Sequence, residues 1–177
     1  MTQQKGFTLI ELIVSLGIMV IVLPTTTLFL LQILQEQTEA QAELQMEQAA
    51  SLLLSELRTE LTEATSINIT GSTLGSDSGV LIFVDRYNET VTIDSVADGA
   101  VTRLRLQRGT DPAVFLTSDD IDVAAWRIDA ARSDDASLTG LHFHLDLVLI
   151  NPEATPYRDV TFTGETTIAL NPQTQEL

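Results

Sequence analysis

The chain has 177 residues and no cysteine, a length that allows one domain with an extension and excludes a disulfide-stabilised miniprotein. Its 25 acidic and 9 basic side chains give a formal net charge of −16, which would repel nucleic-acid phosphates and anionic lipid headgroups. Hydrophobic residues make up 44% of the chain, too many for a disordered acidic tail. We therefore expect a globular core and no direct nucleic-acid binding.

The N-terminal part of the chain is strongly apolar. Within residues 7–23 the only charged side chain is Glu11, and after Pro24 and three threonines the apolar run continues to Leu34. A helix over residues 7–34 would be about 42 Å long at ~1.5 Å per residue, enough to cross a hydrocarbon core of ~30 Å. Lys5 precedes the run and an acidic flank follows it, so the positive-inside rule places the N-terminus in the cytoplasm.

Glu11 lies in an apolar run where a charge is costly. An ionised carboxylate inside a membrane costs roughly 2.5–3.5 kcal/mol, so such acids usually have a partner or a role. A side chain that reaches back to the membrane edge is the simpler alternative.

Residues 5–14 (KGFTLIELIV) resemble the N-terminal signal of type IV prepilins and type II secretion pseudopilins. The resemblance implies that a prepilin peptidase cuts after Gly6 and methylates the new amine of Phe7. It further implies that Glu11 guides the subunit from membrane lipid into a helical filament of other pilins or pseudopilins, with the help of an inner-membrane assembly platform. The subunit would be a single-pass inner-membrane protein first and part of a periplasmic or cell-surface filament afterwards.

The helix is predicted to continue to residue 66. Apolar side chains recur at spacings of three and four, which predicts an amphipathic stripe that packs on the rest of the chain; they are Met46, Ala50, Leu53, Leu57, Leu61 and Ala64. The glutamates off this stripe are interpreted as a solvated face; they are Glu47, Glu56, Glu60 and Glu63. Pro24 lacks an amide hydrogen and its ring crowds the carbonyl of Val20, so the helix should bend or loosen there.

From residue 80 onwards the apolar pattern has a period of two, which is typical of strands. Strands are expected around residues 80–84, 91–93, 103–107, 121–128, 141–149 and 160–170. The change of parity between Val123 and Trp126 predicts a bulge near Ala124 and Ala125. The segment 151–156 (NPEATP) is expected to form a turn or loop.

These elements predict an α+β, pilin-like fold in which a long N-terminal helix packs on an antiparallel β-sheet domain. The expected organisation is a leader (residues 1–6), a transmembrane and filament-core helix (7–34), an amphipathic helix on the globular domain (35–66) and a β-rich globular domain (67–177). A globular domain as small as residues 67–177 cannot bury its core alone and needs the amphipathic helix to cover the sheet.

Two polar clusters were weighed as metal sites. His142, His144 and Asp146 alternate along one strand and share a face, but a solvent-facing surface explains them more simply. The cluster Asp119, Asp120 and Asp122 fails the calcium-loop template because no glycine follows it. No nucleophile, phosphate-binding or zinc-protease motif is present, so we expect no enzyme activity, no metal and no cofactor.

The second half of the chain looks most like J-type minor pseudopilins and W-type minor pilins, through the basic strand around Leu104 and the long strand over residues 142–149. The resemblance therefore implies a minor subunit that helps to initiate or cap filament assembly near the tip. Tip subunits of the K type lack the acid, so Glu11 argues against the outermost position. The alternatives are a major pilin subunit and a single-pass, membrane-anchored binding or sensor domain.

Overall fold

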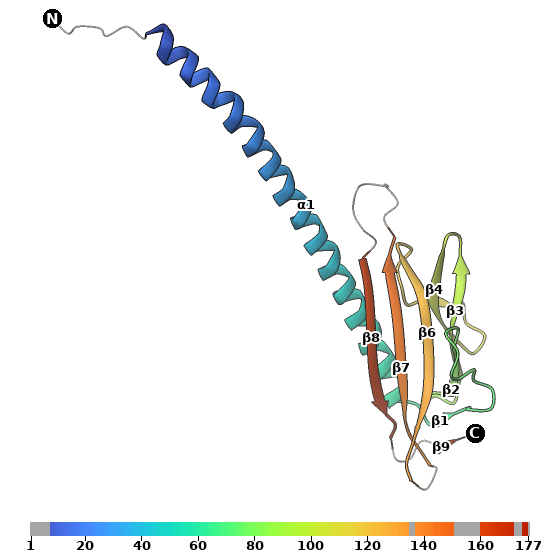
Figure 1. Cartoon of the computed structure of the whole chain (residues 1–177). Coiled ribbons are helices and arrows are strands. Elements are labelled where there is room, and N and C mark those ends of the chain that lie inside the picture. The colour runs from blue at the N-terminus through green and yellow to red at the C-terminus, as the bar shows by residue number, and fades with distance from the viewer. Residues whose placement is uncertain (1–7, 135–136, 151–159, 172–174, 177) are drawn as a thin grey trace, which may run out of the picture. The chain divides into compact units, whose positions relative to one another are not determined.

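The fold is that of a computed structural model, which describes residues 8–134, 137–150, 160–171 and 175–176. It contains one long helix, α1 (Leu9–Thr62), followed by strands, as Figure 1 shows. The chain divides into two compact units, residues 1–41 and residues 42–177. The α+β class with a long apolar N-terminal helix and antiparallel sheets is therefore confirmed.

Two sheets make up the β part, where the sequence had predicted one. The strands are β1 (Ser66–Ile67), β2 (Val80–Val84), β3 (Thr90–Asp98), β4 (Val101–Arg108), β5 (Val114–Phe115), β6 (Ile121–Arg132), β7 (Leu138–Leu149), β8 (Val160–Ala169) and β9 (Gln175–Glu176). The first sheet has the order β5-β4-β3-β2-β1-β9 and the second the order β6-β7-β8. All neighbouring strands are antiparallel except β1 and β9, which are parallel.

The buried stripe of α1 and the inner faces of both sheets form one hydrophobic core. The predicted stripe is confirmed, because Met46, Ala50, Leu53, Leu57 and Leu61 are at most 2% exposed. Alternate residues of β7, such as Leu141 and Phe143, cover the same core, as expected for a strand with one solvated face. The Phe143 ring stacks on Trp126 with centroids 5.3 Å apart.

The end of α1 differs from the expectation. The helix stops at Thr62, whereas residue 66 was expected, and Ser66 already belongs to β1. The reason is that the backbone beyond the helix pairs with β2: Thr65 N–H donates to the Val84 carbonyl at 2.8 Å and Asn68 N–H to the Ile82 carbonyl at 2.9 Å. These amides thus donate their hydrogen bonds to β2, and they need no further helical turn to find an acceptor.

The bulge was predicted correctly. In the pairing of β6 with β7 the register shifts between Val123 and Ala125, and Ala124 is the extra residue. The shift places Val123 and Trp126 in the core although their positions differ in parity. The predicted turn at residues 151–156 lies outside the described residues.

Candidate functional site

The predicted processing residues, Gly6 and Phe7, lie outside the described residues, whereas Glu11 lies in the first turn of α1. The Thr8 N–H donates to Glu11 Oε2 at 3.0 Å, and the Thr8 hydroxyl lies 2.9 Å from the same oxygen. This is the arrangement of a capping box, in which an acid three residues into a helix accepts from the residue that starts it. Glu11 therefore stabilises its own helix end, a role that the sequence analysis missed although the Thr-x-x-Glu spacing signals it.

The helix around Glu11 leaves its apolar side chains uncovered within the unit formed by residues 1–41. From Leu9 to Leu34 the large apolar side chains other than Ile33 are at least 52% exposed, and Ile33 is half-buried. This part of α1 is long and apolar enough to cross a membrane, with a mean hydropathy of 2.3 over its most apolar window. Such a surface needs either lipid or other apolar surfaces around it.

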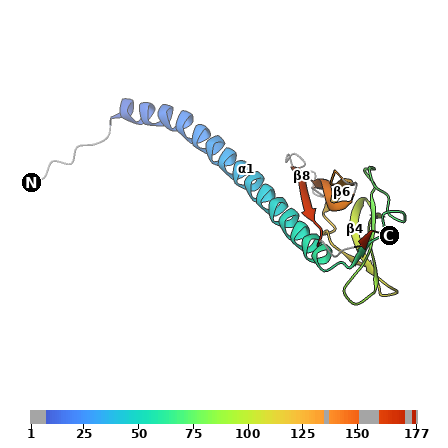
Figure 2. The same cartoon turned by 90° about the horizontal axis from the view of Figure 1, so that it is seen from below.

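Pro24 lies inside α1 and does not break it. α1 is helical on both sides of Pro24, and it curves within its blue part (Figure 2). The three threonines that follow donate their hydroxyls to carbonyls four residues back, at 2.7–2.8 Å, with Ile21, Val22 and Leu23 as the acceptors. Such back-bonds often accompany bending, and α1 stays helical through residues 20–24, where the sequence predicted that it should bend or loosen.

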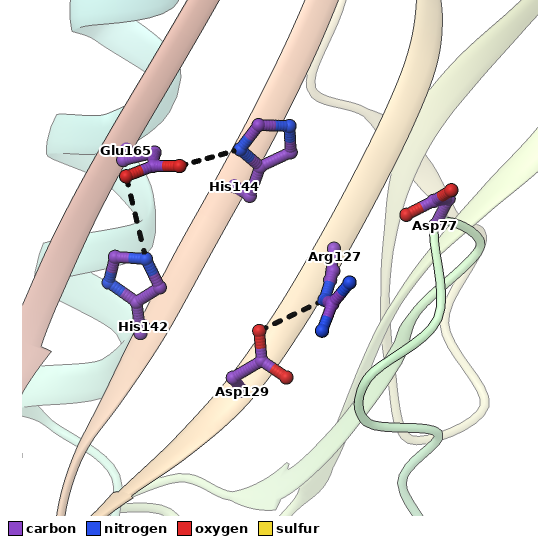
Figure 3. Close-up of a pocket in the computed structure, with 6 residues that line it drawn as sticks. All are labelled: Asp77, Arg127, Asp129, His142, His144 and Glu165. Carbon is purple, nitrogen blue, oxygen red and sulfur yellow. Dashed lines mark hydrogen bonds and ion pairs between the residues drawn. The ribbon is translucent and has the colours of Figure 1, made fainter.

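A second polar site lies on the outward face of the sheet β6-β7-β8. It is a hollow of about 280 Å³ lined by Asp77, Arg127, Asp129, His142, His144 and Glu165, which Figure 3 shows. The predicted common face of His142, His144 and Asp146 is confirmed, because all three alternate with buried leucine and phenylalanine positions of β7. Glu165, which the sequence analysis did not select, joins them from β8.

The contacts in this hollow are specific. His144 Nδ1 lies 3.1 Å from Glu165 Oε1, and its Nε2 lies 3.2 Å from Asp146 Oδ2. His142 Nδ1 lies 3.0 Å from the Thr167 hydroxyl, and its Nε2 lies 3.9 Å from Glu165 Oε2. The hydrogen bond to Glu165 does most to raise the pKa of His144 above its ordinary value; burial opposes the rise and Asp146 adds to it.

The hollow and the acidic cluster do not have the geometry of metal sites. Within the described ranges no group of three or more His, Cys, Asp or Glu side chains is arranged to hold a metal ion. In the acidic cluster, Asp122 Oδ1 accepts from the Thr102 N–H at 2.6 Å and so ties β6 to β4. Asp120 accepts from the Ser118 hydroxyl. Both carboxylates therefore have partners within the fold.

One ion-pair network corrects the interpretation of the helix glutamates as a solvated face. Arg108 Nη2 lies 2.8 Å from Glu60 Oε1, and Arg108 Nη1 lies 3.0 Å from Asp85 Oδ2. The Asp85 side chain is only 3% exposed and also accepts from the N–H groups of Tyr87 and Glu89. Glu60 thus ties α1 to the first sheet, while Glu63 pairs with Arg86 at the surface.

Comparison with known proteins gives one match. Residues 1–23 match the family model described as the prokaryotic N-terminal methylation motif. The matched segment contains the capping box of Thr8 and Glu11 and the beginning of the exposed apolar helix. No curated protein and no solved structure gives a significant match to the chain.

Proposed function

We propose that this chain, whose methylation motif supports a place in the type IV pilin and pseudopilin family, is a minor subunit of a pilus or secretion pseudopilus. The motif supports a pilin-like or pseudopilin subunit, and so a structural subunit rather than an enzyme. It implies processing by a prepilin peptidase and assembly with other pilins. The subunit we propose resembles J-type pseudopilins and W-type pilins and helps to initiate or cap the filament near its tip.

The observation that carries the proposal is Glu11, a carboxylate on an otherwise apolar and exposed helix inside the methylation motif. A helix that serves only as an anchor gains nothing from a charge that costs roughly 2.5–3.5 kcal/mol in the membrane. We propose that cleavage after Gly6 frees and methylates the amine of Phe7. The amine of a neighbouring subunit then pairs with Glu11, and both charges are neutralised in apolar surroundings.

The capping box is compatible with this role. Its two donors, the amide and the hydroxyl, both belong to Thr8, so a cut before Phe7 leaves them in place. Both contacts go to Oε2 of Glu11, which leaves Oε1 as the oxygen that would accept from the neighbour's amine. In this proposal Thr8 orients the carboxylate before a partner arrives.

Before assembly, the subunit is proposed to be held in the inner membrane by α1, with its N-terminus in the cytoplasm. The methylation motif and the exposed apolar helix fit a membrane-anchored protein. The orientation follows from Lys5 before the apolar run and the acidic residues after that run. After assembly, the same apolar side chains would face neighbouring helices in the filament.

The test separates processing from assembly. The full chain is expressed with its prepilin peptidase and partner pilins, and mass spectrometry follows the loss of residues 1–6 and the methylation of Phe7. Gly6→Val should block this cut. Glu11→Leu and Glu11→Gln should be processed and inserted normally, but both should be recovered less than wild type in sheared filaments, because the neighbour's amine loses its ionised partner.

Two control variants refine the result. Glu39→Gln removes an exposed charge of α1 outside the methylation motif and should assemble as wild type does. Thr8→Ala removes the hydroxyl donor of the capping box but keeps the amide donor and the acid, and should assemble better than Glu11→Gln. Recovery of both Glu11 variants in filaments at the wild-type level would contradict the proposal, and so would an intact Met1 in assembled protein.

A further inference from the structure

Strand β8 is the least secured long strand of the second sheet. It is the edge strand of the sheet β6-β7-β8, and within the described residues it pairs with β7 alone. Of its inward-facing residues only Ile168 is buried, while Val160 and Phe162 are half-buried. The facing residues of β7, such as Phe143, are almost fully buried. Apolar packing therefore contributes less to holding β8 than to holding β7.

Two polar side-chain contacts join β7 to β8 on the outward face, that of His142 with Thr167 and that of His144 with Glu165, and the second depends on the protonation of His144. His144 presents one ring nitrogen to Glu165 on β8 and the other to Asp146 on its own strand, at 3.1 and 3.2 Å. Ionised carboxylates only accept hydrogen bonds, and neutral imidazole has one donor. Both contacts can therefore be hydrogen bonds only while His144 is the doubly protonated imidazolium.

Loss of this proton forces a choice between the two carboxylates. A neutral His144 can donate to Glu165 or to Asp146, and its other nitrogen then directs a lone pair at the remaining carboxylate. Asp146 competes well for the donor, because its Oδ1 is buried and has no hydrogen-bond partner in the described part of the chain. The contact with Glu165 is the one more easily lost, because the Glu165 side chain is 61% exposed and can hydrogen-bond to water instead.

We propose that His144 and Glu165 form a proton-dependent clasp that holds the edge strand β8 on β7 and releases it as the pH rises. The inference is independent of the proposed filament role. The charged or titratable groups that face the clasp are Asp146 and His142 on β7, Arg127 and Asp129 on β6, and Asp77 in the loop between β1 and β2. Arg127 Nε is paired with Asp129 Oδ2 at 3.0 Å, so the Asp129 carboxylate offsets its positive charge. The carboxylates of Glu165 and Asp146, which contact His144 directly, therefore favour its protonated form.

The sign of the pH dependence follows from the geometry and is supported by the raised pKa of His144. A histidine that gains a carboxylate partner on strand closure binds its proton more tightly in the closed state. The clasp therefore contributes fully below the ordinary histidine pKa of about 6.5 and is lost as the pH rises through the higher pKa of the closed state.

The experiment measures opening of β8 by amide hydrogen exchange in the full chain, held in non-ionic detergent micelles. At about pH 8 the opening constant of β8 should exceed that at about pH 5.5 by about three- to tenfold, after correction for intrinsic exchange. This factor should equal the ratio of the His144 acid dissociation constants in the open and closed states, which ring NMR titration provides. Amides of β6 serve as the internal reference and should not change.

Variants decide between the clasp and a general effect of pH. Glu165→Gln keeps a hydrogen-bonding side chain but removes the charge; it should lower the pKa of His144 and abolish the pH dependence of β8. His144→Gln should leave β8 as open at low pH as at high pH. His142→Gln should keep most of the dependence, because His142 Nε2 lies 3.9 Å from Glu165.

Two results would overturn the clasp. One is an opening constant of β8 that does not change with pH in the wild-type chain. The other is a Glu165→Gln chain with the wild-type pH dependence. Since Glu165 is an exposed side chain on an edge strand, this variant is expected to fold and provides the test even if His144→Gln does not.

Discussion

The two units of the chain use the same helix and similar apolar side chains in opposite ways. In the unit of residues 1–41, leucine, isoleucine and valine side chains occur all around α1, and all of those described except Ile33 are at least half exposed. In the unit of residues 42–177, the apolar side chains of α1 lie mainly on one stripe and the stripe is almost completely buried. The second unit thus encloses its own core, whereas the first depends on lipid or on other chains for cover.

The largest effect is expected when the chain is shortened from its N-terminus. A chain that begins at Ala42 keeps the whole buried stripe and should be a folded, acidic monomer. A chain that begins at Ser66 lacks Leu53, Leu57 and Leu61 and leaves the inner faces of the sheets uncovered, so it should aggregate. Size-exclusion chromatography, with the fluorescence of the single tryptophan, Trp126, distinguishes the two, and equal behaviour of both chains would disprove helix-on-sheet packing.

A smaller effect is expected from single leucines. Leu57→Ala removes a side chain that is 0% exposed and should lower the free energy of unfolding by about 2–5 kcal/mol. Leu52→Ala, five residues earlier in α1 and 72% exposed, should change it by no more than about 0.5 kcal/mol. Denaturant unfolding of the full chain in micelles, followed by Trp126 fluorescence, gives both values. Similar losses of unfolding free energy for the two variants would contradict the burial of Leu57 and the exposure of Leu52.

The smallest of the three effects concerns ion pairs. Arg108→Ala removes a partner from Asp85, which is 3% exposed, and should cost about 1–3 kcal/mol in the free energy of unfolding. Arg86→Ala breaks a pair with Glu63 in which both side chains are at least 41% exposed, so it should cost at most about 0.5 kcal/mol. The same unfolding measurement applies. A cost for Arg86→Ala as large as that for Arg108→Ala would show that burial does not separate the two pairs.

Local periodicity accounts for what the sequence predicted well. The stripe from Met46 to Leu61 follows from the helical repeat, and the bulge at Ala124 follows from a change of parity within one strand. The shared face of His142 and His144 follows from the same alternation. The first-turn position of Glu11 depends on its distance from the start of the helix, which the apolar run also predicts.

Contacts between distant segments account for what was missed. Glu60 and Arg108 are far apart in the chain, and no local pattern connects them. Glu165 reaches His144 only because β8 pairs with β7 in one particular register. The division into two sheets likewise depends on which strands become neighbours. The capping box is different, because the Thr8-x-x-Glu11 spacing is local and by itself predicts the hydrogen bonds at the helix end.

The parallel pairing of β1 with β9 has a consequence for the timing of folding. β1 follows the end of α1, and Ser66 pairs with Gln175 near the other end of the chain. A contact between such distant residues closes a long loop and forms slowly. Because a chain is synthesised from its N-terminus, the first sheet cannot gain β9 until residues 175–176 have been made. Until then β1 keeps an open edge on the side that β9 later covers.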